Sequence, residues 1–99
     1  MHIFLTSLPY GAYRTYTTDY NGLNPGNGFE KAVKDVWKKG SSVLFIASEP
    51  DNYEMVDGLK NELKKRLEGS QLDFSSLASC DHRNCDEAAE DINKYDAIF

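Results

Sequence analysis

The chain opens with His2-Ile-Phe-Leu-Thr-Ser-Leu-Pro-Tyr-Gly-Ala-Tyr-Arg-Thr15, and this stretch sets the expected fold class. Its first half, 2–8, predicts a buried strand, and its second half is a loop of hydroxyls, tyrosines and glycine. In an open α/β sheet, ligands bind beyond the carboxyl ends of the strands, near the point where the strand order reverses. The first strand usually borders that point, so the sequence predicts a site in this loop.

Length and composition indicate one small domain, spanning residues 1–99. The net charge of −5 argues against a nucleic-acid partner. The sequence shows no apolar run near the roughly 18 residues of a membrane span and no signal-peptide pattern at its start, so no membrane partner is expected. Cys80 and Cys85 are too few for a disulfide framework. We therefore expect a cytoplasmic protein.

A long connection, Pro9–Asn27, follows the first predicted strand. Strand-to-helix connections usually take about 2–6 residues, and longer ones tend to be functional or disordered. Disordered segments are poor in aromatic residues, whereas this one holds four tyrosines: Tyr10, Tyr13, Tyr16 and Tyr20. The segment is therefore expected to form an ordered flap.

Hydrophobic spacing predicts the first two helices and the strand between them. The first helix starts after an Asn27 cap, ends before Gly40, and turns these residues inward: Phe29, Ala32, Val33, Val36 and Trp37. Ser42–Ser48 is a continuous apolar run, typical of a parallel strand covered on both faces. Asp51 and Glu54 have capping-box spacing at the start of the second helix. That helix ends at Gly69 and has the apolar stripe Val56, Leu59, Leu63 and Leu67.

The remaining residues extend the same alternation. Leu72–Ala78 predicts a third strand, and Asn84 with Glu87 predicts the cap of a third helix, whose inward residues are Ala88, Ala89, Ile92 and Tyr95. Asp96–Phe99 has the character of a fourth strand that has only begun. Alternating strands and helices predict a three-layer, flavodoxin-like α/β fold with a parallel sheet and helices on both faces. The expectation is a sheet truncated at the start of its fourth strand.

Several short motifs together resemble the N-terminal half of the peptidase E-like branch of the peptidase E and cyanophycinase family. They are Ile3-Phe-Leu-Thr-Ser7, Gly11-Ala-Tyr-Arg-Thr15, Asn21-Gly-Leu-Asn-Pro25, Leu44-Phe-Ile-Ala-Ser48, Asp51-Asn-Tyr-Glu-Met55, Asp81-His-Arg-Asn84 and Tyr95-Asp-Ala-Ile98. The family consists of serine hydrolases on a class I glutamine-amidotransferase-like fold. The resemblance extends over nearly the whole chain.

The resemblance implies a peptidase, acting on a small peptide such as an aspartyl dipeptide, whose serine nucleophile lies beyond residue 99. Such an enzyme needs a base beside the serine and fixed N–H donors for the oxyanion, and none of these maps onto this chain. The 99 residues alone are therefore predicted to be inactive, with no catalytic residue, cofactor or metal. One wall of the substrate pocket is expected from Ser7, Tyr10, Arg14, Ser48 and Asp51.

Other functions are compatible with the same residues. A non-catalytic flavodoxin-like module for a small ligand or a protein partner is the main alternative. Thr6, Ser7 and Gly11 suggest phosphate or flavin binding, but no helix N-terminus follows them directly. Arg14 either pairs with a substrate carboxylate or stacks on a neighbouring tyrosine.

Two further readings concern the segment Cys80-Asp-His-Arg-Asn-Cys85. Its cysteines and His82 have metal-like spacing, whereas structural zinc needs four ligands. Asp81 stands near the position of a phosphorylated aspartate in a response regulator, but the acidic residues that complete the Mg²⁺ site are missing. The simpler interpretation is a strand-to-helix turn with two ordinary thiols.

A sheet that stops at its fourth strand leaves an edge of unpaired backbone groups and uncovered apolar helix faces. We therefore expect a two-fold homodimer joined through the sheet edge or a helix face.

Overall fold

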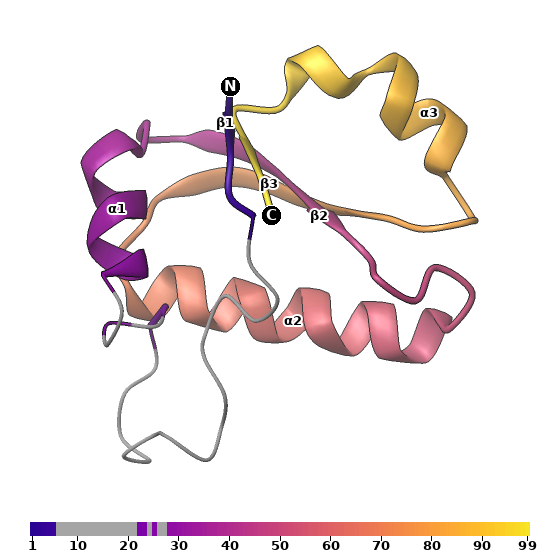
Figure 1. Cartoon of the computed structure of the whole chain (residues 1–99), viewed down its shortest axis with the longest axis horizontal. Coiled ribbons are helices and arrows are strands. Elements are labelled where there is room, and N and C mark those ends of the chain that lie inside the picture. The colour runs from indigo at the N-terminus through magenta and orange to yellow at the C-terminus, as the bar shows by residue number, and fades with distance from the viewer. Residues whose placement is uncertain (6–21, 24, 26–27) are drawn as a thin grey trace.

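The computed structural model describes residues 1–5, 22–23, 25 and 28–99. Strands and helices alternate along the chain (Figure 1). The elements are β1 (His2–Ile3), α1 (Phe29–Val36), β2 (Ser41–Ile46), α2 (Tyr53–Gly69), β3 (Phe74–Cys80), α3 (Cys85–Glu90), a short 3₁₀ helix (Ile92–Lys94) and β4 (Ala97–Ile98). The α/β class predicted from the sequence is confirmed.

The four strands form one parallel sheet in the order β1-β4-β2-β3. β2 is a central strand: Leu44 lies opposite Ile98 of β4 on one side and opposite Ala78 of β3 on the other. A strand that is paired on both sides and covered on both faces needs apolar residues throughout, which explains the unbroken apolar run of the sequence.

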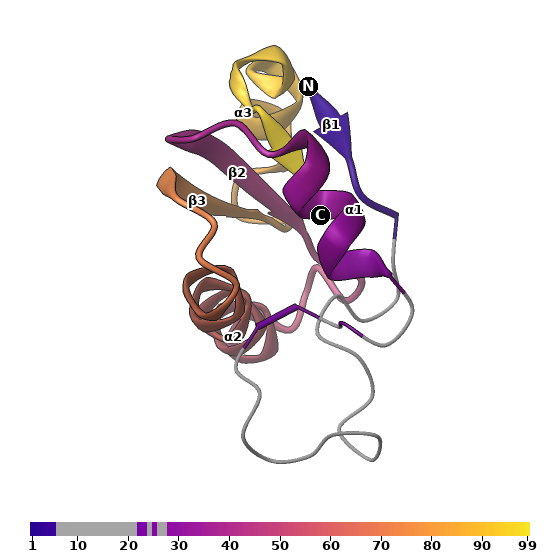
Figure 2. The same cartoon turned by 90° about the vertical axis from the view of Figure 1, so that its left-hand side faces the viewer.

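Side chains of successive β2 residues enter two separate cores, because neighbouring residues of a strand point to opposite faces. Val43 joins a buried cluster with Val33 of α1 and Leu63 of α2, while Leu44 joins a second cluster with Ala88 of α3. Figure 2 shows the same division, with α2 and α3 on opposite sides of the sheet. The three-layer arrangement is therefore as predicted.

The strand order places a reversal at the neighbouring strands β2 and β3. From β2 the chain crosses to β3 on one side and then back past β2 to β4 on the other. The direction in which strands are added thus reverses after β3, and β1 is an outer strand of the described sheet, beside β4. The connections after the neighbouring strands β2 and β3 lead to helices on opposite faces of the sheet, so the residues that follow these two strands are placed at such a reversal. That the first strand borders a reversal point stays a prediction.

The two short helices bury fewer residues than their sequence patterns predict. In α1, Val33 is fully buried, but Ala32 and Val36 are exposed. In α3, Ala88 is buried and Ala89 is exposed. A helix of two turns that lies on a sheet touches it along a narrow stripe, so the apolar residues at the margins of the pattern remain outside.

Several helix and strand ends differ from the predicted ones at the turns that join helices to strands. Leu72 is buried, but it lies before β3 and is not part of it. Its N–H donates to the Leu67 carbonyl (3.0 Å), and this bond closes the end of α2. Gln71 beside it has a left-handed φ of 60°. Gly40 is also left-handed, with a φ of 75°, but it lies in the turn before β2 rather than directly at the end of α1.

Candidate functional site at the carboxyl edge of the sheet

The segments that follow β2 and β3 come together at the carboxyl edge of the sheet. The N–H of Ala47 donates to the Cys80 carbonyl (3.1 Å), and the N–H of His82 donates to the Pro50 carbonyl (3.2 Å). These two backbone bonds extend the β2–β3 contact past the ends of the strands. They place Ser48 and Asp51, two of the predicted site residues, beside the turn at residues 81–84.

Asp51 and His82 form a direct side-chain contact between the two segments. The Asp51 carboxylate is paired with Nδ1 of the His82 imidazole, and both side chains are more than half exposed. Nε2 is therefore the ring nitrogen left for another partner. A carboxylate that orients a histidine in this way is one half of the machinery by which hydrolases activate a nucleophile.

The other half is not found in the described residues, where His82 has no hydrogen bond to a serine or cysteine side chain. Ser48 is exposed at this edge. Burial raises the pKa of the Cys80 thiol, which keeps that group in its neutral, poorly nucleophilic form. The edge can hold and orient a polar ligand, but it does not assemble a nucleophile with its base.

Arg83 is held by two carboxylates behind this edge. Its guanidinium contacts Asp81 (Nη2–Oδ2, 2.6 Å) and Asp57 of α2 (Nη2–Oδ1, 2.8 Å) and lies over the Tyr53 ring, 4.5 Å from the centroid. Hydrogen bonds from Arg83 lower the pKa of both carboxyls, and the same bonds raise the pKa of Arg83. The positive charge of Arg83 is therefore neutralised by these two carboxylates, and Arg83 is a structural link between α2 and the turn after β3.

Asn84 shapes that turn instead of capping the helix with its side chain. Its Oδ1 accepts from the Asp81 N–H (3.0 Å), and its Nδ2 donates to the Ser79 carbonyl (2.7 Å). Asn84 does precede the first residue of α3, but its side chain accepts no bond from the helix N–H groups. The predicted side-chain cap is wrong, because the asparagine closes the loop that buries Asp81.

The remaining sequence predictions divide into two groups. Ser7, Tyr10 and Arg14, with the whole of the predicted flap except a few positions near its end, lie outside the described residues. The metal-like spacing of Cys80, His82 and Cys85 does not give a metal site in the described part of the chain, where no three such ligands converge. The two cysteines are free thiols.

The sequence does not predict a place in the substrate pocket for His82, Arg83 or Asp57, although the first two belong to a polar segment that follows a predicted strand. Asp81-His-Arg-Asn84 follows a predicted strand and is rich in polar groups, which is the signal that points to the carboxyl edge. Asp57 carries no such signal. It stands on an exposed helix face, and only the packing of α2 under the sheet brings it to Arg83.

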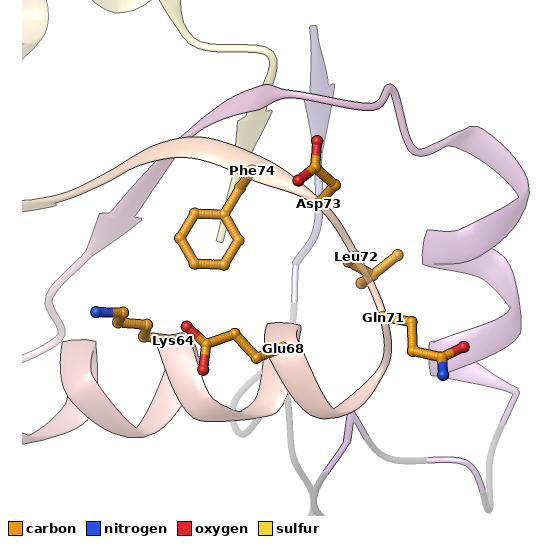
Figure 3. Close-up of a pocket in the computed structure, with 6 residues that line it drawn as sticks. All are labelled: Lys64, Glu68, Gln71, Leu72, Asp73 and Phe74. Atoms are coloured by element: carbon orange, nitrogen blue, oxygen red, sulfur yellow. The ribbon is translucent and has the colours of Figure 1, made fainter.

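Open hollows lie at the opposite, amino edge of the sheet. One of about 460 Å³ is lined by residues of α2 and of the connection to β3, drawn in Figure 3: Lys64, Glu68, Gln71, Leu72, Asp73 and Phe74. A second, of about 470 Å³, shares Gln71–Asp73 and extends to Trp37, whose indole N–H donates to the Asp73 carbonyl (2.8 Å). Neither hollow contains a residue of the predicted site.

The class defined by these features is a three-layer parallel α/β protein with polar loops at the carboxyl edge of its sheet. A scan against protein-family models finds no match, and neither the curated proteins nor the solved structures yield a similar chain. In the described part of the chain, no helix combines the length and apolar character needed to cross a bilayer.

Proposed function

We propose that this chain is the N-terminal half of a peptidase E-like serine hydrolase domain and supplies one wall of its substrate pocket. The supporting observation is the joining of the segments after β2 and β3, which places Ser48, Asp51 and His82 at the carboxyl edge. Ligands of open parallel sheets bind at this edge. The substrate class carried over from the resemblance is a small peptide, such as an aspartyl dipeptide.

In this proposal the chain binds and orients, and the nucleophile comes from residues beyond these 99. The exposed Nε2 of His82 is suited to accept a hydrogen bond from a peptide N–H or donate one to a carboxylate, because Asp51 holds the other ring nitrogen. A cytoplasmic location belongs to the same proposal and agrees with two unpaired thiols.

A second candidate is a non-catalytic binding module. The observation that favours it is that His82 has no serine or cysteine partner in the described part of the chain. A module of this kind needs only the ligand wall and the fold that supports it.

One measurement tests the inactivity of the 99-residue chain, which both candidates predict, and a second separates the candidates. The purified 99-residue chain, incubated with aspartyl dipeptides, is expected to release no free aspartate; measurable hydrolysis contradicts the proposal. Sequencing the reading frame past the Phe99 codon is expected to find a Gly-x-Ser-x-Gly-like segment. A stop codon directly after Phe99 in the native gene overturns the hydrolase proposal and favours the binding module.

A further inference from the structure

The outer edge of β3 has backbone groups that no described strand covers. β3 is an outer strand of the described sheet. Its inner edge pairs with β2 in continuous register from Ser76, opposite Ser42, to Cys80, opposite Ile46. The Cys80 carbonyl points toward β2, where it accepts a hydrogen bond from the Ala47 N–H. The backbone N–H and C=O groups of Ser76 and Ala78 therefore point toward β2 as well. Leu77 and Ser79 therefore direct their N–H and C=O groups outward, because alternate residues of a strand bond to opposite sides.

This open edge is short and has defined ends. At its carboxyl end, the Ser79 carbonyl already accepts from Asn84 Nδ2 (2.7 Å). At its amino end, the register shifts between Ser41 and Ser42, so the regular edge begins at Ser76. Among the described residues, three groups of this regular edge have no hydrogen-bond partner: the N–H and C=O of Leu77 and the N–H of Ser79. That number suits a short extended peptide rather than a long sheet-to-sheet junction.

A groove between β3 and α2 runs beside these groups. It has a volume of about 350 Å³ and is lined by Lys60, Asn61 and Lys64 of α2 and by the β3 residues Phe74–Leu77. Lys64 and Phe74 also line the neighbouring hollow at the amino edge, where Figure 3 shows the Phe74 ring projecting from β3 toward α2. The groove thus offers an aromatic surface and two ammonium groups next to unpaired backbone.

The charge of this groove is opposite to that of the molecule. Its lining holds two lysines and no carboxylate, whereas the whole chain has a net charge of −5. Neither lysine forms an ion pair in the described part of the chain. An acidic partner is therefore attracted to this groove, although the net charge of the chain is negative.

A second copy of this chain fits the same edge poorly. A two-fold pairing of β3 with β3 of another copy runs the two strands antiparallel and sets the Lys60 and Lys64 sides of the two α2 helices against each other. Like charges that face each other across an interface are unfavourable. The homodimer predicted from the sequence therefore has to use another surface.

We propose that the β3 edge binds an extended acidic peptide by strand addition, with peptide carboxylates at Lys60 and Lys64 and peptide backbone bonded to Leu77 and Ser79. Main-chain hydrogen bonds give such complexes their affinity, and side chains on alternate residues give them specificity. This surface lies along the side of the sheet, away from Ser48, Asp51 and His82, so its test is independent of the hydrolase proposal.

The test uses a blocked Val-Glu-Val-Glu-Val peptide titrated into ¹⁵N-labelled protein. Saturable shift changes are expected at Leu77, Ser79 and Lys64, with binding weakened by salt. The double variant Lys60→Ala/Lys64→Ala is expected to raise the Kd about three- to tenfold, since exposed ion pairs make small individual contributions. Lys65→Ala is the matched control on the same helix; it does not line the groove and should leave the Kd unchanged.

A second peptide tests the backbone pairing without altering the protein. N-methylation of alternate peptide residues removes the donors that strand addition needs and keeps the carboxylates, so binding should be lost. Equal binding of the methylated and unmethylated peptides overturns the proposal, as does a Kd that is the same in the double variant and the control. Concentration-dependent self-association that protects the Leu77 amide assigns the edge to a second copy and also overturns it.

Discussion

Asp81 has a buried carboxylate that is paired mainly with Arg83, two residues further along the chain. Its oxygens accept from the Arg83 backbone N–H (2.8 Å) and from the Arg83 guanidinium, and its side chain is almost fully buried. These bonds favour the charged form and hold the pKa of Asp81 below its ordinary value of 3.8. Asp57 and Asp96 have lowered pKa values for similar reasons, through Arg83 and the Ser42 N–H respectively.

The lowered pKa values predict the pH dependence of stability. A carboxyl group whose pKa is lower in the folded state stabilises the fold above its unfolded pKa of about 3.9, and that contribution is lost as pH falls through the folded value. The free energy of unfolding should therefore fall steeply below about pH 4. Urea titrations from neutral to acid pH test this. Asp81→Asn should lower stability at neutral pH and flatten the acid slope; a variant curve parallel to the wild-type curve contradicts the assignment.

At the scale of single elements, two neighbouring polar residues at the start of α2, Asp51 and Asn52, have different roles. The sequence predicts Asp51 as the cap, but in the structure Asn52 accepts the Met55 N–H (3.2 Å), while Asp51 turns to His82. Asn52→Ala should cost about 0.5–2 kcal/mol of stability, the usual range for a lost cap. Asp51→Ala removes an exposed pair and should cost less. Urea unfolding followed by circular dichroism compares the two; a larger loss for Asp51→Ala restores the sequence-based assignment.

Two glycines have opposite roles in this fold. Gly58 is inside α2, and an added Cβ there meets no atom within 4 Å. Gly58→Ala should stabilise the protein by about 1 kcal/mol, the helix-propensity difference. Gly40→Ala is the matched comparison and should destabilise by about 1–2 kcal/mol, because φ at this position is 75°. The same sign of effect at both positions would contradict this account of the backbone.

How much the sequence predicts varies with the type of element. β2 and α2 were predictable, since a long apolar run and a four-residue stripe leave few alternative structures. The margins of α1 and α3 were not, because Ala32, Val36 and Ala89 fit a helical pattern and still miss the sheet. Periodicity reports the direction of a side chain, and the distance to the neighbouring layer decides whether it is buried.

For the whole molecule, the sheet order is the feature that local patterns do not contain. The sequences of β1 (His2–Ile3) and β4 (Ala97–Ile98) contain no local signal that β4 pairs with both β1 and β2. The reversal at β2 and β3 sets Ser48 and Asp51 at the carboxyl edge, beside the turn that follows β3. Asp57 joins Arg83 for the same reason, since only the packed layers bring α2 to the turn after β3.

The proposed function requires that a ligand binds at the carboxyl edge of β2 and β3. The most direct measurement is an NMR titration of the ¹⁵N-labelled chain with L-aspartyl-L-leucine, with the amide shifts mapped onto the sequence. Saturable changes are expected at Ser48, Asp51 and His82, and they should be lost in Asp51→Ala. Shifts that instead gather at Gln71–Phe74, or no saturable shift at the carboxyl edge, would contradict the central claim.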